Sequence, residues 1–267
     1  MGIRVGCGSW GDDAYQDLLF SRRTPLGERL AGYARHFDHV EVNSSYYATP
    51  RAEVTRAWAK QTSDGFLFDI KLHRAFSQSP EKTARDGKLV KMLLDGVKPL
   101  IKAKKLGVFL LVLDPRFGPD RHGLEELDPL AEALSPHPLA VEVRHRGWVT
   151  GSQRTATLEF FRKRKLAWVA VDMPRIPSLL PPIYAVTRPD LAYLRLHGRN
   201  PGWGRAATAA ERHAYVYSPR QIQGLARKIR EMAGKAKEVR VVANNHAQDF
   251  APRTALALRA ALGDAAQ

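Results

Sequence analysis

The sequence predicts an α/β protein that folds as a TIM-like (β/α)8 barrel. Eight short runs of β-branched and apolar residues recur along the chain, and helical patterns separate most of them. In several runs the apolar residues alternate with Glu, Arg, Lys, His or Asn. Because alternate side chains of a strand point to opposite faces, each such run has one apolar face and one reactive face. A closed barrel places the apolar faces against helices and the reactive faces toward its mouth.

Length and composition agree with a single barrel domain over residues 1–267. The chain is near the usual size of this fold, with 44% hydrophobic and 26% charged residues. Its longest apolar stretch, Gly107–Leu113, is too short to cross a bilayer, and the N-terminal residues lack a signal-peptide pattern. Cys7 is the only cysteine, which excludes an intrachain disulfide. We therefore expect a cytoplasmic protein with no membrane segment.

The eight predicted strands are short runs rich in β-branched or aromatic residues. Helical patterns between them favour parallel pairing, since parallel strands need long crossover connections. The predicted strands are Ile3–Cys7, Val40–Asn43, Phe66–His73, Gly107–Leu113, Leu139–His145, Ala167–Asp172, Ala192–His197 and Val239–Asn245.

Helices are predicted where apolar residues recur at helical spacing. Pro99 is expected to kink the longest of them, and Ser218 with Pro219 provides an N-cap and a first-turn proline for another. The predicted helices are Leu26–Phe37, Lys88–Leu106, Thr155–Lys165, Gln221–Gly234 and a final helix after Ala251–Pro252.

Two segments depart from regular alternation. Pro174–Pro189 is rich in proline, and we expect an irregular loop there in place of the sixth helix. Gly198–Gly204 begins a second long loop after the seventh strand. Loops that follow barrel strands face the mouth, so both are candidate walls of a site.

The chain is strongly basic, with 42 Lys and Arg against 27 Asp and Glu and a net charge of +15. This balance favours an anionic partner, either a small molecule or nucleic acid. Lys102–Lys105 and Arg162–Lys165 both lie at the carboxyl ends of predicted helices, just before a strand, where cations also complement the helix dipole. The two clusters are therefore either solvated helix ends or a surface for a polyanion. The sequence does not indicate an oligomeric state.

The segment Gly6–Gly11 matches the dinucleotide-binding pattern G-x-G-x-x-G directly after the first strand. That pattern requires its glycines to open a helix, whereas Trp10 is bulky and the next residues do not indicate one. We favour a tight loop at the barrel mouth with Trp10 as a wall.

Candidate catalytic residues lie at the ends of the second, fifth and seventh strands. Glu41 or Glu142 is a candidate general base, and His197 is a candidate general acid. An alternative for Glu142 is an internal salt bridge with Arg144.

Cations and amides near the strand ends are candidates for substrate binding. Arg195, Arg199, Asn244 and Asn245 could form an anion cradle, because barrels often bind phosphate at the loops after strands seven and eight. The full set of predicted substrate-binding residues is Trp10, Asn43, Lys71, Arg144, Arg195, Asn244 and Asn245.

A divalent metal is a possible cofactor, although no tight ligand motif supports it. Lys71, Arg144 and Arg195 would repel a cation at the same place. The side chains that could converge on a metal are Glu41, Glu142, Asp172, His197 and His246.

Six ordered motifs together resemble the YecE-like family, also known as domain of unknown function 72. They are GCGSWG, EVNSSYY, FLFDIKL, EVRHRGW, YLRLHG and NNHAQDFAP, and they span the chain from Gly6 to the last helix. The resemblance implies a TIM-like barrel but no assigned activity. Many relatives carry a Thr-His pair after the lysine of the third strand, whereas this chain has His73–Ser79 there.

The residue pattern leaves three function classes open. The first is an enzyme that hydrolyses a phosphate-containing substrate, for example nucleic acid. Its cations would stabilise the negative charge of the transition state. The second is a sugar or sugar-phosphate isomerase that uses the same carboxylates for proton transfer. The third is a non-catalytic module that binds nucleic acid or protein, in which the mouth residues form only a structural network.

Overall fold

The computed structural model describes residues 2–265 and contains one closed barrel of eight parallel strands. The strands follow chain order around the barrel, and β8 closes it by pairing with β1 along the full length of both strands. The strands are β1 (Gly2–Cys7), β2 (His39–Val42), β3 (Leu67–Lys71), β4 (Leu106–Val112), β5 (Leu139–Glu142), β6 (Ala167–Asp172), β7 (Leu191–Leu196) and β8 (Glu238–Ala243).

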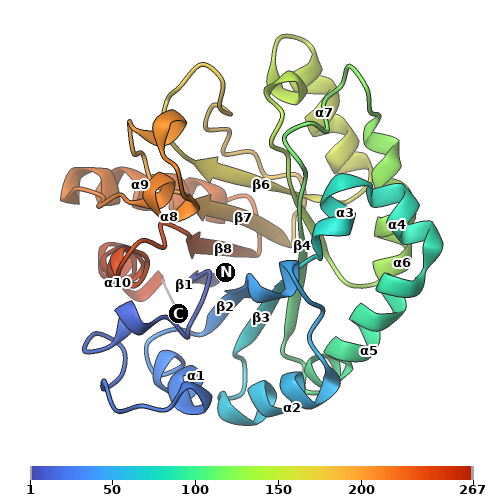
Figure 1. The fold of residues 1–267 in the computed structure, drawn as a ribbon. Helices are drawn as coiled ribbons and strands as arrows, with labels where there is room; N and C mark the ends of the chain where they lie inside the picture. Colours follow the sequence, from blue (N-terminus) through green and yellow to red (C-terminus); the bar gives the residue numbers. More distant parts are fainter. Residues whose placement is uncertain (1, 266–267) are drawn as a thin grey trace.

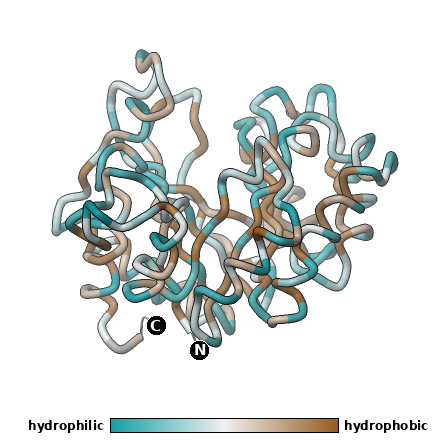
Figure 2. Tube along the Cα trace, turned by 60° about the horizontal axis from the view of Figure 1, so that its bottom comes forward, coloured by the Kyte–Doolittle hydropathy of each residue, from teal (hydrophilic) through white to brown (hydrophobic). Residues whose placement is uncertain are grey.

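Helices surround the barrel on its outside (Figure 1). Apolar side chains of the strands pack against them and form one continuous hydrophobic core. Figure 2 shows the hydrophobic segments in the middle of the molecule and many hydrophilic segments in the outer turns. The helices are α1 (Arg29–Tyr33), α2 (Ala52–Gln61), α3 (Arg74–Gln78), α4 (Pro80–Asp86), α5 (Lys88–Lys102), α6 (Asp128–Leu134), α7 (Gln153–Lys163), α8 (Ala209–His213), α9 (Pro219–Ala233) and α10 (Phe250–Leu262).

All eight predicted strands are confirmed, but six of them end one to three residues earlier than expected. β2, β3 and β5 stop at Val42, Lys71 and Glu142, and the chain then turns into the loops at the mouth. These shorter strands leave the reactive residues at the carboxyl edge of the barrel.

The helix predictions are confirmed in part. α9 begins as expected, with the Ser218 hydroxyl accepting a hydrogen bond from the backbone N–H of Gln221. α5 continues through Pro99 and ends at Lys102. The predicted helix at Leu26–Phe37 is wrong in length, because a 3-10 turn precedes α1, which covers only Arg29–Tyr33.

The connection between β6 and β7 contains no helix, as the prolines of this segment predict. Side chains still anchor it to the barrel. The indole Nε1 of Trp168 donates to the carbonyl of Ile183 at 3.0 Å, and the Thr187 hydroxyl donates to the carbonyl of Leu166 at 2.6 Å. The later part of this segment is therefore held against the amino end of β6, where Leu166 and Trp168 lie.

Within residues 2–265, no helix combines the length and the apolar character that spanning a membrane requires.

Candidate functional site

A buried guanidinium joins two carboxylates in the centre of the barrel. Arg195 donates through Nε and Nη2 to the two oxygens of Glu41, at 2.9 and 2.7 Å. Its Nη1 donates to Oε2 of Glu142 at 2.5 Å. Burial alone would raise the pKa of Glu142, but Arg195 and His197 outweigh burial and hold this pKa well below its ordinary value. Glu142 is therefore ionised at neutral pH.

A chain of hydrogen bonds at the mouth sets the tautomer of His197. Asn43 Nδ2 donates to the carbonyl of Gly8 at 2.8 Å and lies 3.4 Å from Asn244 Oδ1. Asn244 Nδ2 in turn lies 3.1 Å from Nδ1 of His197. Because the amide donates to Nδ1, the ring proton is on Nε2, which lies 3.3 Å from Oε2 of Glu142. Burial lowers the pKa of His197, so the ring is neutral and orients Glu142.

A second buried cluster lies deeper in the barrel. The Tyr193 hydroxyl is 3.1 Å from both Glu41 Oε2 and Asp69 Oδ2. Asp69 Oδ1 accepts from the backbone N–H of Val108 at 3.1 Å and from the guanidinium of Arg240. Burial, opposed by Arg240, raises the pKa of Asp69 to about 6. Tyr193 thus connects two layers of charged side chains into one polar interior.

A cavity of about 310 Å³ opens above this interior, at the carboxyl ends of the strands. Barrel enzymes hold their active sites at this face, and the volume is near the lower end for small-molecule sites. The lining residues are Gly8, Ser9, Asp12, Asn43, Tyr47, Lys71, Arg144, Arg195, His197, Ala209, His213, Asn244 and His246.

Two cations face the cavity with few protein partners. Lys71 Nζ lies 4.4 Å from the centre of the Tyr46 ring and donates no hydrogen bond to a described residue. Burial, together with repulsion from Arg195, lowers the pKa of Lys71 to about 8. Arg144 Nη1 lies 3.4 Å from Oε1 of Glu142. This ion pair lacks hydrogen-bond alignment, since the buried Oε1 accepts no hydrogen bond within residues 2–265.

Two predicted substrate-binding residues lie outside the cavity lining. Trp10 packs edge-on against Trp58, with ring centres 5.2 Å apart. Asn245 points away from the mouth, because it follows Asn244 on the opposite phase of the strand. Its Nδ2 donates to the carbonyl of Tyr215 at 2.9 Å and to the Thr254 hydroxyl at 3.0 Å. The other predicted substrate-binding residues do line the cavity: Asn43, Lys71, Arg144, Arg195 and Asn244.

Arg199 is not free to bind an anion. Its Nε and Nη2 each donate to one oxygen of Asp172 at 2.7 Å. Asp172 also accepts from the hydroxyls of Tyr217 at 2.9 Å and Tyr184 at 3.3 Å. The four residues of the predicted anion cradle do not come together, because only Arg195 and Asn244 line the mouth cavity, while Arg199 binds Asp172 and Asn245 binds Tyr215 and Thr254.

The acidic and imidazole side chains considered as metal ligands do not converge. Among residues 2–265, no three Asp, Glu, His or Cys side chains are placed to hold one ion. Two of the carboxylates share Arg195, and Asp172 is bound by Arg199. The residues considered were Glu41, Glu142, Asp172, His197 and His246.

Each of the two basic clusters uses one cation for a local structural role. Lys105 is buried and donates to the carbonyls of Ala59 and Thr62 at the end of α2, both at 2.7 Å. Arg164 donates to both oxygens of Asp128, at 2.8 and 2.7 Å. Their neighbours remain exposed: Lys102, Lys104, Arg162, Lys163 and Lys165.

His213, on α8, is a cavity residue that the sequence pattern did not indicate. Its Nδ1 lies 3.0 Å from the carbonyl of His197, and its ring packs 4.6 Å from that of His246. Burial, with repulsion from both imidazoles, lowers the pKa of His213 to about 2, so it is neutral. His213 forms part of the cavity wall, and the sequence pointed to that wall only through the long loop expected after the seventh strand. A single histidine beyond that loop belongs to no recognisable motif.

Gly8 permits the close approach of the two amides at the mouth. A Cβ at this position would lie 2.5 Å from Asn43 Nδ2 and 2.7 Å from Asn244 Oδ1. We expect Gly8→Ala to lower the free energy of unfolding by about 1–3 kcal/mol, as overpacking does. Urea denaturation would measure the change, with Gly11→Ala as the control because a Cβ there meets no atom within 4 Å. Equal stability of the two variants would contradict the proposed packing of the amides.

The fold and the cavity define a class: a (β/α)8 barrel with a charged, partly buried site at the carboxyl ends of its strands. The sequence matches the profile of the family described as Protein of unknown function DUF72 over residues 4–267. The chain belongs to this family, which confirms the YecE-like resemblance.

Relatives of known sequence and structure carry the same assignment. The UPF0759 protein YunF of Bacillus subtilis is 26% identical over 255 residues, which cover 91% of this chain and 89% of YunF. A crystal structure of a DUF72 family protein from Enterococcus faecalis has a TM-score of 0.88 at 30% identity, covering 97% of this chain and 95% of that one. A DUF72 family protein from Thermotoga maritima has a TM-score of 0.85 at 28% identity, covering 98% and 99%.

Proposed function

We propose that this barrel protein is an enzyme that hydrolyses a small phosphate ester in the mouth cavity. The observation that carries the proposal is the unequal use of the two oxygens of Glu142. Oε2 accepts from Arg195 and lies within reach of the His197 Nε2–H, whereas the buried Oε1 accepts no hydrogen bond from residues 2–265. A buried acceptor without a donor is costly, so Oε1 is suited to accept one from a bound water or substrate.

The charges around Oε1 favour an anionic substrate. Arg144 lines the cavity with only one loose ion pair, and Lys71 has no hydrogen-bond partner among the described residues. Arg195 and the two glutamates together carry one negative charge, and Asp12 on the cavity lining adds another, so Lys71 and Arg144 bring the site to a formal charge of about zero. The positive charge of the mouth is concentrated on these two side chains, which have few partners in the protein. A phosphate group between Lys71 and Arg144 would replace solvent at both cations.

The proposed reaction assigns one role to each group. Glu142 Oε1 takes a proton from a water molecule that attacks phosphorus, and the bond from phosphorus to the ester oxygen breaks. Lys71, protonated at pH 7 with its pKa lowered to about 8, supplies a proton to the leaving oxygen. Arg144 stabilises the charge on the phosphoryl oxygens. In this proposal His197 and Glu41 are positioning residues for Glu142 and Arg195, respectively.

Loss of the Lys71 cation is expected to weaken anion binding. Lys71→Met should raise the Kd of inorganic phosphate at pH 7 at least tenfold, because a partly desolvated charge contact contributes about 1.5–3 kcal/mol. Titration calorimetry would measure this, with Lys91→Met as the control because Lys91 is a surface residue paired with Asp95. Unchanged affinity in Lys71→Met would remove Lys71 from the proposed site.

The affinity of the mouth cavity for an anion should also depend on pH and should decrease as the pH rises. Lys71 loses its proton as the pH rises through about 8, so binding should weaken above that pH. Sulfate is the suitable probe, because its own charge is constant from neutral to mildly alkaline pH. Lys71→Arg should keep its affinity across the same range, since arginine stays protonated.

A panel of phosphomonoesters, phosphodiesters and short oligonucleotides tests the reaction itself. Release of phosphate or alcohol would support hydrolysis, while rearranged sugar phosphate without release would support the isomerase alternative. The exposed cations of the two basic clusters make nucleic acid the first polymer to try. Salt-sensitive nucleic-acid binding that survives changes in the mouth, without turnover of any substrate, would instead support a binding module.

A further inference from the structure

Cations gather at the amino ends of the last three strands, on the side of the barrel opposite the mouth. The segments that lead into β6, β7 and β8 cover residues 162–166, 187–190 and 233–237. Together they hold seven Lys and Arg residues and one acidic residue, Asp190. The mouth adds little net charge, so the +15 of the chain lies on outer surfaces such as this one. We call these three segments the basic face.

Hydrogen bonds join the three segments into one surface. Nη1 of Arg188 donates to the carbonyl of Lys165 at 2.7 Å, and the backbone N–H of Lys237 donates to the carbonyl of Pro189 at 2.9 Å. An open hollow of about 490 Å³ lies where the second and third segments meet. The residues that line it are Pro189, Ala233, Gly234, Lys235, Ala236 and Lys237.

Most cations of the basic face have no partner in the protein. Two of the seven are bound by carboxylates, Arg164 by Asp128 and Arg188 by Asp190. The other five are exposed, and their side chains form no ion pair or hydrogen bond with a described residue: Arg162, Lys163, Lys165, Lys235 and Lys237. These five charges face solvent, where a polyanion can reach them.

Lys165 occupies a backbone position that favours glycine. It follows α7 with a φ of 52°, and the N–H of Leu166 donates to the carbonyl of Phe161 at 2.9 Å, which closes the helix. Helices that end in this way commonly have glycine there, because any side chain is strained at positive φ. Lys104, with a φ of 56°, follows α5 in the same way before β4. Lysine is less favourable than glycine for the fold at both positions, but it keeps a cation on the amino side of the barrel.

We propose that the basic face binds the phosphate backbone of a nucleic acid. Phosphates follow one another at short, regular intervals along a nucleic acid, so several can contact separate cations at once. The three segments contain no exposed large hydrophobic residue, whereas protein interfaces depend on apolar or aromatic anchors. This surface is separate from the mouth and does not depend on the reaction proposed there.

Fluorescence anisotropy with a short labelled DNA duplex, measured at several salt concentrations, tests the basic face. The triple variant Lys165→Gly, Lys235→Ala and Lys237→Ala should raise the Kd about tenfold or more. It should lower the slope of log Kd against log salt by about 2–3, since each lost phosphate contact removes about one unit. Lys165→Gly alone should weaken binding yet keep or raise the melting temperature, because glycine relieves the backbone strain. A lysine with only a structural role would not give that combination.

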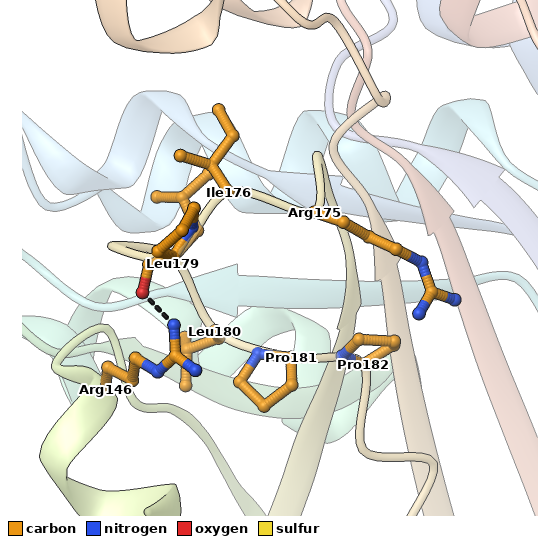
Figure 3. Close-up of a pocket in the computed structure, with 8 residues that line it drawn as sticks. Arg146, Arg175, Ile176, Leu179, Leu180, Pro181 and Pro182 are labelled. Carbon is orange, nitrogen blue, oxygen red and sulfur yellow. Dashed lines mark hydrogen bonds between the residues drawn. The ribbon is translucent and has the colours of Figure 1, made fainter.

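The matched control removes three exposed cations from loops on the carboxyl side of the barrel. Arg51→Ala, Arg175→Ala and Arg205→Ala together change the net charge by the same amount, and none of the three lines the mouth cavity. Figure 3 shows Arg175 and Arg146 on opposite sides of a cavity of about 280 Å³ in this region, which shares no lining residue with the mouth. Arg175 forms no ion pair with a described residue. The control should leave the Kd of the duplex within about twofold.

The other outcomes overturn the proposal. Equal weakening in the triple variant and the control would mean that binding follows net charge alone. Absence of duplex binding in the unchanged protein, or its loss in Lys71→Met, would also remove the basic face as the binding surface. Tighter binding to vesicles that contain phosphatidylserine than to the duplex would assign the face to a membrane instead. Hydrolysis of a small ester in the mouth is tested separately by the substrate panel, so either proposal can fail alone.

Discussion

Arg195→Met should lower the free energy of unfolding by about 3–5 kcal/mol at pH 8, the range for breaking a buried ion pair by removing one partner. The reason is that Glu41 and Glu142, both fully buried, lose their shared cation. Tyr193 and His197 would remain as hydrogen-bond donors to them, with Arg144 as a loose ion-pair partner of Glu142. Urea denaturation followed by circular dichroism would measure the loss.

The loss of stability in Arg195→Met should depend on pH, in a direction that the pKa of Glu142 determines. In the unchanged protein its pKa is held low, so its contribution to stability is present above the ordinary carboxyl pKa and is lost as the pH falls through the depressed value. Without Arg195, burial would raise that pKa above its ordinary value. The stability deficit of Arg195→Met should therefore be largest at pH 8 and shrink toward pH 5.

Arg199→Met is the matched control for this prediction. Arg199 also binds a carboxylate through two nitrogens, but its side chain is 28% exposed and Asp172 keeps two tyrosine hydroxyls. Its removal should cost about 1–2 kcal/mol. Adding Glu41→Gln and Glu142→Gln to Arg195→Met should restore part of the lost stability, because uncompensated charge is then removed. Equal losses for the two single arginine variants would contradict the central role of Arg195.

Glu142→Gln should reduce kcat on a phosphate ester that the protein hydrolyses by about 10²–10⁴-fold, the usual contribution of a general base. The amide oxygen can still accept from Arg195 and from His197, but the group at the position of Oε1 no longer accepts a proton from water. KM should change little, since Lys71 and Arg144 hold the substrate in the proposed site.

Glu41→Gln separates this catalytic role from a structural one. It removes a carboxylate from the same guanidinium, but both oxygens of Glu41 already accept hydrogen bonds from Arg195. We expect a comparable loss of stability in the two glutamine variants and a loss of kcat below about tenfold in Glu41→Gln. Equal losses of kcat would mean that both carboxylates only maintain the structure of the mouth.

The strand pattern predicted the barrel and most of its polar interior from local chemistry. Alternation in the runs that contain Lys71, Glu142 and Arg195 assigned these side chains to the inner face, where the structure has them. The prolines of the sixth connection likewise predicted the absence of a helix. Helix lengths were less accurate, because a 3-10 turn at Leu26–Glu28 precedes α1, which ends at Tyr33. The helix at Ala52–Gln61 was missed, since its apolar positions are few and only Thr55 is buried.

The partner of each charge could not be predicted from the sequence. Arg195 lies in β7 and Arg199 in the loop directly after it, yet one joins two glutamates and the other binds Asp172. Pairing depends on which residues face each other across the barrel, and the strand alternation does not determine that. The positions of Trp10 and Asn245 outside the cavity lining could not be predicted either, because their contacts come from distant segments.

The sequence by itself determined the eight-stranded barrel, its family and the side chains that face its interior, because alternation and helix signals are local along the chain. Only the tertiary structure decided that both oxygens of Glu41 accept hydrogen bonds, while one oxygen of Glu142 accepts none from the described residues. It also decided that Lys71 and Arg144 are the cations with the fewest partners at the mouth. These properties arise from distances between strands far apart in sequence, which set burial, hydrogen bonding and pKa together.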